Sequence, residues 1–479
     1  MAEQSFTWPA AVFWLLIAAG TFWRGPGLLY VFTAAGAFGT LLMVPGELVG
    51  KVNILPQPVC AVFLVLKILL QREQIARAVN TLLDPARLGF LFLFLVYGLV
   101  SAYIMPRLFA HTVTVIPITA TVNWPVALEP SSGNITQSAY LALSIGVSLA
   151  FALAAARPEF LRHYLLALLF GGFVFILTGV MDLVLTNVGL ASLLEPFRNA
   201  AYTLHVDVES STGKRVVGLM PEASAYGPLC VANAASLAFL RPLFMGKVRD
   251  FIVPAAVLGL LAMAALSFSS TAYVGIAVFG CAYALNWVRR LSSRADVVRR
   301  GLGLEALAAG AALIAFLTVL TLAPKLTDPV FDKLDSMLVT KTQSSSYAQR
   351  MMWNQVGIDA FFATRGIGAG LGSARSSSWY VAILSNTGYI GAALLICFIL
   401  QLYLRQAPDD PQKAELVTGL KFALIPNFAT AGLTGLSPDF GVANGALFGL
   451  IVSAAASPNA SSPALAAIDS ANAGAARPR

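Results

Sequence analysis

Long runs of apolar residues alternate along the chain with short polar stretches, and the length of each run predicts its structure. Most runs have the roughly 20 residues that an α-helix needs to cross the hydrocarbon core of a membrane. The chain is therefore expected to be an all-α polytopic membrane protein, with residues 1–456 forming a single transmembrane domain. The pattern predicts about 12–13 transmembrane helices, near residues 9–23, 28–44, 54–70, 88–105, 138–156, 164–185, 223–240, 251–268, 271–288, 302–323, 377–400, 416–434 and 440–456.

The distribution of lysine and arginine predicts which side of the membrane each loop faces. Short cytoplasmic loops carry an excess of these residues. The predicted helix order places the basic loops on one side, which we assign to the cytoplasm. Three longer segments, 106–137, 186–222 and 324–376, then fall together on the outer side. The basic loops contain Arg72, Arg77 and Arg87; Arg157 and Arg162; Arg241, Lys247 and Arg249; and Arg289, Arg290, Arg294, Arg299 and Arg300.

Composition supports the membrane prediction and bounds the function. Of 479 residues, 58% are hydrophobic and 11% are charged, against about 25% charged in soluble domains. The formal net charge of +8 is assigned to the inner loops, because no basic run interleaved with aromatics predicts nucleic-acid binding. The histidines and cysteines lack the spacing of metal ligands, so neither metal nor cofactor is expected. Residues 457–479 are predicted to be a disordered cytoplasmic tail.

The first candidate site precedes the helix expected at 223–240. Arg215 and Glu222 lie there, and Glu222 stands at the helix N-terminus, where the helix dipole favours an ionised carboxylate. One interpretation is structural, with Glu222 stabilising the helix end and Arg215 as its salt-bridge partner. The other is functional, with Arg215 binding an anion beside a carboxylate that accepts a proton.

A second candidate site lies in the outer segment that ends at 376. Glycines alternate with other residues from Gly366 to Gly372, and serines that include Ser377 open the next helix. Glycines let the backbone approach a phosphate, and a capped helix N-terminus attracts anions. A flexible loop that ends in an N-cap is the alternative. Arg350 lies in a pattern typical of an amphipathic helix on the outer membrane surface, where it either joins a site or reaches lipid headgroups.

A third polar stretch precedes the helix expected at 138–156. Asn134 and Gln137 carry side-chain amides that both donate and accept hydrogen bonds. They either bind a sugar or cap and turn the chain ahead of the helix.

These motifs together resemble the Wzy-type O-antigen and exopolysaccharide polymerases and the related O-antigen ligases. In that family an outer arginine precedes a Gly-x-x-x-Glu-x-Ser-x-x-Gly segment. In this chain the pattern consists of Arg215, then Gly218, Glu222, Ser224 and Gly227. Arg350, the 366–372 run and the stretch 386–391 are similar to the family's large periplasmic loop and the helix after it, and 134–137 is similar to a segment of some exopolysaccharide members.

The chain departs from the ligases of this family at one position. They carry His-Asn at the start of the helix after the large loop, where this chain has Ser377 and Ser378. The usual histidine candidate for a general base is therefore missing. Glu222 is the carboxylate that remains for that role.

The resemblance implies a metal-independent membrane glycosyltransferase of the GT-C type in the bacterial inner membrane, with its active site facing the periplasm. The implied reaction is polymerisation of undecaprenyl-diphosphate-linked oligosaccharide repeat units into exopolysaccharide or O-antigen. Arg215, Glu222 and Arg350 are the expected catalytic residues. The expected substrate-binding residues are Arg198, Tyr226, Arg365, Gly368, Gly370, Arg375, Ser377, Asn134 and Gln137.

The expected partners are the polyprenyl-diphosphate-linked oligosaccharide and membrane lipid, together with a flippase, a chain-length regulator and export proteins. Three other functions stay open: an O-antigen ligase that transfers glycan to another acceptor, a flippase or transporter of the lipid-linked oligosaccharide, and a structural scaffold in a synthase complex, which would tolerate loss of every outer arginine. A transporter predicts interrupted helices in matched halves and charges near mid-membrane. The candidate charges here cluster in outer segments instead.

Overall fold

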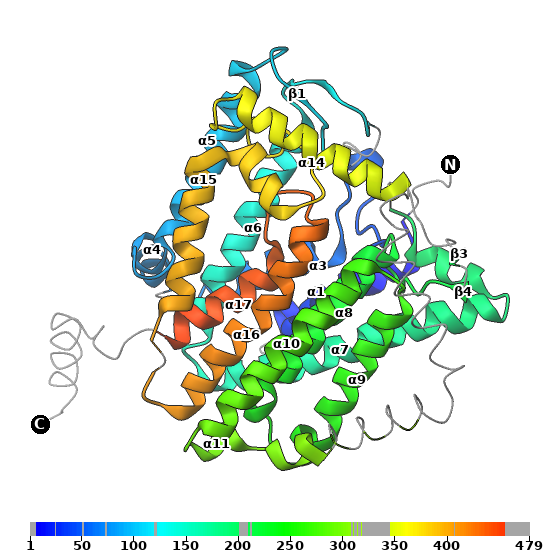
Figure 1. The fold of residues 1–479 in the computed structure, drawn as a ribbon, viewed down its shortest axis with the longest axis vertical. Coiled ribbons are helices and arrows are strands. Elements are labelled where there is room, and N and C mark those ends of the chain that lie inside the picture. The colour runs from blue at the N-terminus through cyan, green and yellow to red at the C-terminus, as the bar shows by residue number, and fades with distance from the viewer. Residues whose placement is uncertain are drawn as a thin grey trace, which may run out of the picture.

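The computed structural model describes residues 6–23, 25–49, 52–71, 74–118, 122–200, 209–210, 213–307, 310, 314, 318, 345–406 and 408–455. This part of the chain is almost entirely helical, and eight of its helices are long and apolar enough to cross a membrane (Figure 1). The fold is thus that of an all-α polytopic membrane protein, as the apolar runs predict. The eight helices are α5 (Gly89–Leu108), α6 (Ser132–Ala154), α7 (Pro158–Asn187), α8 (Ala223–Leu240), α9 (Val253–Leu266, which continues the turn Val248–Ile252 into a span of 19 residues), α10 (Ser270–Ser292), α15 (Trp379–Leu404) and α16 (Pro411–Thr434).

Shorter elements complete the bundle. Three of them are also apolar: α1 (Trp8–Phe22), α3 (Pro56–Leu69) and α17 (Gly441–Ala454). The other α-helices are α2 (Gly27–Ala35), α4 (Gln74–Leu83), α11 (Asp296–Arg299) and α14 (Ser345–Ala363). Short helical turns span Gly46–Val49, Ala191–Phe197, Arg241–Leu243 and Val248–Ile252. Two antiparallel ribbons pair β1 (Thr114–Val115) with β2 (Val126–Ala127) and β3 (Glu209–Ser210) with β4 (Gly213–Lys214).

One of the predicted spans differs from the structure. The helix expected at 28–44 ends at Ala35, and the chain then turns to pair with a distant segment. Thr40, which is fully buried, donates its N–H to the carbonyl of Leu219 at 3.2 Å, and its hydroxyl reaches the carbonyl of Phe197 at 3.0 Å. These tertiary hydrogen bonds replace the helical ones. Most of the span expected at 302–323 lies outside the described residues, as does the tail 457–479.

Close helix packing in the core uses small residues. Gly445 and Gly449 lie four residues apart on α17 and face α6. A Cβ atom at either position would collide with a backbone oxygen of α6, that of Ser144 or that of Ser148. Small residues at this spacing let two membrane helices approach closely.

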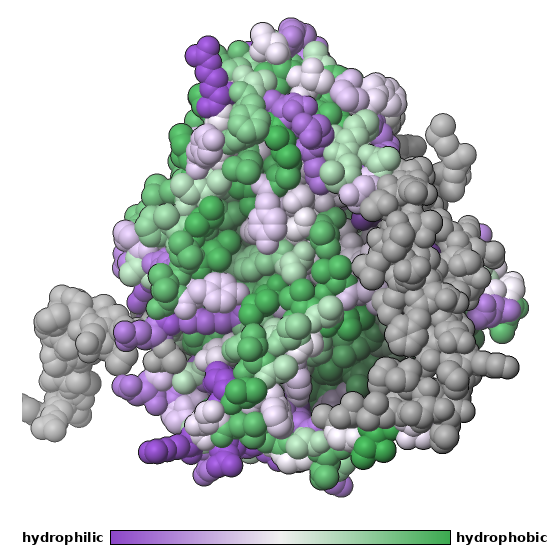
Figure 2. Space-filling view, viewed as in Figure 1, coloured by the Kyte–Doolittle hydropathy of each residue, from purple (hydrophilic) through white to green (hydrophobic). Residues whose placement is uncertain are grey.

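The bundle has two ends, which we call the α14 end and the α11 end. In Figure 1, α14 lies across the top near β1, and α11 lies at the bottom. Figure 2 shows hydrophilic residues at both ends of this face, with mainly hydrophobic residues between them. The described parts of the segments 106–137, 186–222 and 324–376 meet at the α14 end.

The α11 end holds three buried charged side chains in one cluster. The Glu305 carboxylate pairs with Arg241, and its Oε2 atom lies 2.9 Å from Nη1 of Arg290. Arg290 also donates to the carbonyls of Val298 and Arg300 at 2.9 and 2.7 Å. Buried charges are tolerated when they are paired. The cluster therefore fastens the ends of α8 and α10 to the chain around residue 305.

Candidate functional site

The segment 213–222, which leads into α8, carries Arg215 at the α14 end. Nε of Arg215 donates to the carbonyl of Ser267 at 3.2 Å, and the N–H of Val216 donates to the carbonyl of Leu266 at 3.1 Å. Both acceptors belong to the end of α9, where helix carbonyls have no partner in their own helix. The C-terminal end of α9 therefore fixes the backbone and the side chain of Arg215.

Asp182, near the end of α7, holds the same segment from the other side. Its side chain is fully buried, and Oδ1 lies 2.8 Å from both Nη2 of Arg198 and Nζ of Lys214. Oδ2 accepts the N–H groups of Val217 and Gly218 at 2.8 and 3.1 Å. Four donors thus satisfy one carboxylate. Residues on both sides of Arg215 are tied to this single side chain.

The start of α8 meets α14 through three polar side chains. Glu222 is the N-cap residue of α8, and the Ser224 hydroxyl donates to its Oε1 atom. Nη2 of Arg350, on α14, donates to Oγ of Ser224 at 3.1 Å and lies 3.9 Å from Oε1 of Glu222. Two of the expected catalytic residues are therefore neighbours in space although they lie far apart in sequence.

Arg215 is close enough to this group for the charges to interact. The pKa of Arg215 is lowered, mainly because the side chain is buried. The Arg350 guanidinium lowers this pKa further, and the Glu222 carboxylate acts in the opposite direction. The side chains of Arg350 and Glu222 are 31% and 42% exposed. Arg215, Glu222, Ser224 and Arg350 thus form a partly exposed group with two guanidiniums, one carboxylate and one hydroxyl. We call it the arginine cluster.

A third arginine lies next to this cluster. Arg350, Trp353 and Asn354 are three and four residues apart on α14, a spacing that places them on one face of the helix. The guanidinium of Arg375 lies 5.1 Å from the centre of the Trp353 ring, and its Nη1 donates to Oδ1 of Asn123 at 2.7 Å. Arg375 therefore contacts a residue that lies about one helical turn along α14 from Arg350. Burial lowers the pKa of Arg375.

Ser377 and Arg365 have different positions at this end. The N–H of Ser377 donates to Oδ1 of Asn354 at 2.8 Å, so the buried Ser377 helps to dock α15 on α14. Arg365 lies in the turn after α14, has a φ of 54° and is exposed. The structure thus places Arg375 against Trp353 of α14, Ser377 in the contact between α14 and α15, and Arg365 on the surface.

Arg198 and Tyr226, which were expected to bind substrate, are parts of the framework. Nη2 of Arg198 is bound to Asp182 and to the carbonyl of Gly218, each at 2.8 Å, and its side chain is 10% exposed. Tyr226 is fully buried, and its hydroxyl donates to the carbonyl of Phe175 at 2.7 Å. The ring packs so closely on Gly218 that a Cβ atom there would lie 2.7 Å from it. Internal partners account for both side chains.

Gly368 and Gly370, also expected at the substrate, form no phosphate cradle. Both are buried with positive φ angles of 92° and 100°. A Cβ atom at Gly368 would lie 2.6 Å from the nitrogen of Gly388, and one at Gly370 would lie 2.7 Å from the carbonyl oxygen of Ser101. Their N–H groups already donate to acceptors within the protein. The glycines therefore serve close packing of this loop against α15 and α5.

Asn134 has the capping role that was the alternative to sugar binding. It is buried, its Nδ2 donates to the carbonyl of Leu371 and to Oγ of Ser373, and its Oδ1 accepts the N–H of Ser131 at 2.9 Å. It thus caps α6 and fastens the glycine-rich loop to it. Gln137, on the next turn of α6, is half-buried, and its side chain has no hydrogen bond within the described part of the chain.

The sequence analysis missed the residues that position the cluster. Asp182 was available as a signal, because a carboxylate inside an apolar run is costly and so has a partner. Asn386, inside the run predicted at 377–400, is fully buried and accepts the N–H groups of Ser373 and Ala374 at 3.0 and 3.1 Å. Its Nδ2 donates back to the carbonyl of Ala374 at 2.7 Å. Asp182 holds the segment that leads into α8, and Asn386 holds the loop between α14 and α15.

Comparison with known proteins does not assign a function to this site. The sequence matches no protein-family model and no curated protein. Within the described residues, no group of three or more His, Cys, Asp or Glu side chains is placed to hold a metal ion.

Proposed function

We propose that the chain is a membrane glycosyltransferase that polymerises polyprenyl-diphosphate-linked oligosaccharide repeat units. The observation that carries this proposal is the contact of Arg350 with Ser224 and Glu222, beside Arg215. Arginine suits a diphosphate because its planar fork donates to two oxygens at once. The similarity of the 215–227 segment to the Wzy-type polymerases supports the same reaction.

The arginine cluster has the groups that this reaction needs. The oxygen of an acceptor hydroxyl, on the next repeat unit, forms a bond to the anomeric carbon of the donor glycan. The bond between that carbon and the diphosphate oxygen breaks, and the diphosphate leaves with the bonding electron pair. Glu222 takes the proton of the acceptor hydroxyl. Arg215, Arg350 and the neighbouring Arg375 hold the negative charge that develops on the diphosphate, which is a stabilisation of about 2.7–4 kcal/mol per donor by analogy with oxyanion sites.

We assign the α14 end to the periplasm. The arginine-rich loops that contain Arg157, Arg241 and Arg290 lie at the α11 end, and such loops remain in the cytoplasm. A repeat unit carried by a polyprenyl lipid of the periplasmic leaflet then meets the arginine cluster with its diphosphate at the membrane surface. The bacterial inner membrane has these two sides and such carriers.

Reconstitution of the full chain with synthetic diphosphate-linked repeat units tests the proposal. A ladder of lengthened lipid-linked products is expected. Transfer only to a different acceptor would identify a ligase, and movement of the substrate across the bilayer without a new bond would identify a flippase. Either of these results contradicts polymerisation.

A variant series tests the role of the cluster in the same assay. Arg215→Ala and Arg350→Ala are expected to abolish the ladder at unchanged protein abundance, because each removes a donor to the leaving group. Arg107→Ala is the matched control, since Arg107 is exposed at the same end and belongs to no expected site. Unchanged polymer in both Arg215→Ala and Arg350→Ala would dismiss the cluster as the site.

A further inference from the structure

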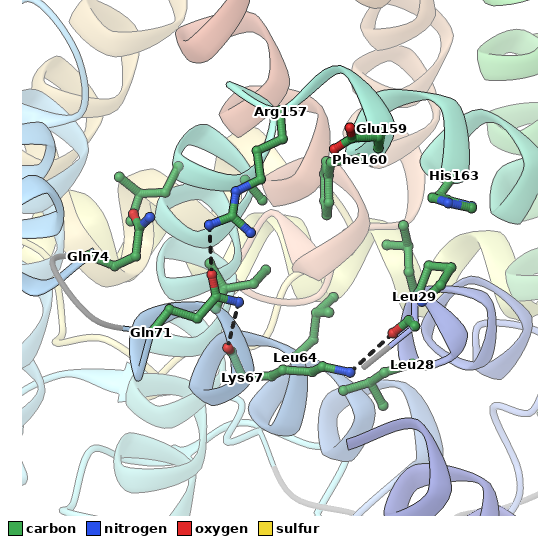
Figure 3. Close-up of a pocket in the computed structure, with 15 residues that line it drawn as sticks. Leu28, Leu29, Leu64, Lys67, Gln71, Gln74, Arg157, Glu159, Phe160 and His163 are labelled. Atoms are coloured by element: carbon green, nitrogen blue, oxygen red, sulfur yellow. Dashed lines mark hydrogen bonds between the residues drawn. The ribbon is translucent and has the colours of Figure 1, made fainter. Parts of the chain in front are cut away.

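A cavity of about 300 Å³ lies at the other end of α7, far from the arginine cluster (Figure 3). It is bounded by the end of α3, the start of α4, the end of α6 and the start of α7. Its apolar floor includes Leu64, Ile68 and Phe160. His163 of this cavity and Asp182 beside the cluster are separated by roughly 28 Å along α7, at 1.5 Å per residue. The cavity is therefore a separate feature. Its polar lining consists of Lys67, Gln71, Gln74, Arg157, Glu159 and His163.

Gln74 gives the cavity an unused hydrogen-bond acceptor. The residue is 7% exposed, and its Oε1 atom has no hydrogen-bond partner in the described part of the chain. Most buried side-chain polar atoms have a partner. Because an amide oxygen only accepts, the missing group is a donor such as a hydroxyl. The volume lies at the lower end of the range for ligand sites, about 300–1,000 Å³.

The charges of the cavity favour an anion. Lys67 and Arg157 contribute two positive charges and Glu159 one negative charge. The Lys67 ammonium donates to the carbonyls of Gly20 and Trp23 at 2.6 and 2.7 Å, so it closes the end of α1. Nη2 of Arg157 donates to Gln71 at 2.9 Å, as Figure 3 shows. The exposed Arg157 side chain therefore has further donors to offer a ligand.

An apolar groove of about 760 Å³ adjoins this cavity. Gly25 and Pro26 line both, and the hydroxyl of Tyr30 in the groove lies 3.5 Å from Nδ1 of His163 in the cavity. The groove follows α1 from Trp8 to Trp23, between α1, α2 and the middle of α7. Its lining side chains are almost wholly apolar, which suits a hydrocarbon chain.

The groove opens toward the bilayer, and its polar end lies at the membrane surface. Leu16 on α1 and Leu177 on α7 are 46% and 56% exposed, so both walls face outward. Trp23, at the end shared with the cavity, is 76% exposed. Exposed tryptophans mark the level of the lipid headgroups. The cavity thus stands at headgroup depth, and the groove runs from it into the hydrocarbon.

We propose that the cavity and the groove together bind one anionic phospholipid whose headgroup carries a hydroxyl, the chemistry of phosphatidylglycerol. The phosphate accepts hydrogen bonds from Arg157, the headgroup hydroxyl donates to Oε1 of Gln74, and one acyl chain lies along α1 in the groove. Basic pockets between membrane helices on the cytoplasmic side bind such headgroups. The lipid belongs to the leaflet at the α11 end and is not the glycan donor.

Titration of delipidated full-length protein in detergent with phosphatidylglycerol tests the proposal, with binding followed by native mass spectrometry. Saturable binding to one site is expected, together with a higher melting temperature. Phosphatidylethanolamine, which is zwitterionic, is the lipid control. Polyprenyl phosphate is the second arm. Equal binding of phosphatidylglycerol and phosphatidylethanolamine, or displacement of phosphatidylglycerol by polyprenyl phosphate, would overturn the assignment.

Variants locate the site. Arg157→Gln and Gln74→Leu are each expected to weaken phosphatidylglycerol binding at least about tenfold, the loss of one hydrogen bond to a charged or buried group. Arg157→Lys, which keeps the charge, retains most of the binding. Arg77→Gln, an exposed arginine outside the cavity lining, leaves it unchanged. Monodisperse elution of every variant confirms folding, and wild-type affinity in both Arg157→Gln and Gln74→Leu sinks the proposal.

Discussion

The Oδ2 atom of Asp182 lies 2.8 Å from the backbone nitrogen of Val217, so a side chain of α7 holds the segment 213–222, which carries Arg215. The other oxygen of the same carboxylate holds Arg198 and Lys214. A buried carboxylate with two cationic partners cannot be removed without leaving charge behind. The position of Arg215 is therefore coupled to the stability of this end of the bundle.

Asp182→Asn is expected to destabilise the protein and to reduce polymer formation. The amide leaves the buried Arg198 and Lys214 without a counter-charge, and breaking a buried ion pair costs about 3–5 kcal/mol. Thermal unfolding in detergent measures the change. Glu195→Gln, an exposed carboxylate on the helical turn Ala191–Phe197, is the control and keeps the wild-type melting temperature. A variant at position 182 that melts like wild type would show that these contacts are weak.

Arg350→Lys is expected to lower the turnover number about 10²–10³-fold, the loss seen when one oxyanion donor is removed. Lysine keeps the charge but lacks the planar fork that binds two oxygens. Initial rates with diphosphate-linked repeat units give the number. Arg107→Lys, at an exposed position at the same end of the bundle, serves as the matched replacement. Equal turnover of wild type and Arg350→Lys would mean that charge alone suffices.

Gly388→Ala is expected to lower the melting temperature more than Gly189→Ala. Gly388 breaks α15 with φ 61° and ψ −161°, a conformation essentially restricted to glycine that costs other residues about 1–3 kcal/mol. An added Cβ would also collide with the backbone of Gly366 and Ile367. Gly189 has a positive φ of 76°, but nothing lies within 4 Å of its Cβ position. Equal shifts of the melting temperature in the two variants would show that the loop at Gly366 and Ile367 moves away from the added Cβ at little cost in stability.

Asn386→Ala is expected to loosen the loop between α14 and α15. The change leaves the buried N–H groups of Ser373 and Ala374 without an acceptor, which costs about 1–3 kcal/mol for each group. Faster protease cleavage within 366–375 than in wild type is the readout. Gln355→Ala, which removes an exposed amide on α14, provides the comparison. If cleavage rates match, the loop is held by packing rather than by this amide.

The helical fold could be predicted from the sequence because the length of an apolar run is enough to indicate a membrane helix. A run such as 88–105 has one stable solution in a membrane, a helix, and α5 is found there. The prediction was wrong for the run 28–44. The run is apolar enough for a membrane helix, but after Ala35 its backbone pairs with Leu219 instead, a contact that no local pattern predicts. The amphipathic pattern around Arg350 correctly indicated the helix α14.

The candidate site was only partly readable. The motif pattern predicted one site from Arg215, Glu222 and Arg350, and in the structure Arg350 lies 3.9 Å from Glu222 while Arg215 interacts with both charges. The glycines at 368 and 370 looked like a phosphate loop because glycine frequency does not distinguish approach to a ligand from approach to another backbone. Geometry shows the second case. Asn134 and Arg198 were expected at the substrate, whereas Leu371 and Asp182 bind them inside the protein; Leu371 lies 237 residues from Asn134, so no local pattern predicts that contact.

Glu305 is synthesised after the two arginines with which it pairs. Arg241 and Arg290 leave the ribosome first, and until residue 305 follows, each must keep its charge in water or among headgroups. The ends of α8 and α10 can therefore form this buried contact only after residue 305 has been synthesised. A nascent chain that stops before Glu305 would leave both arginines without this carboxylate partner.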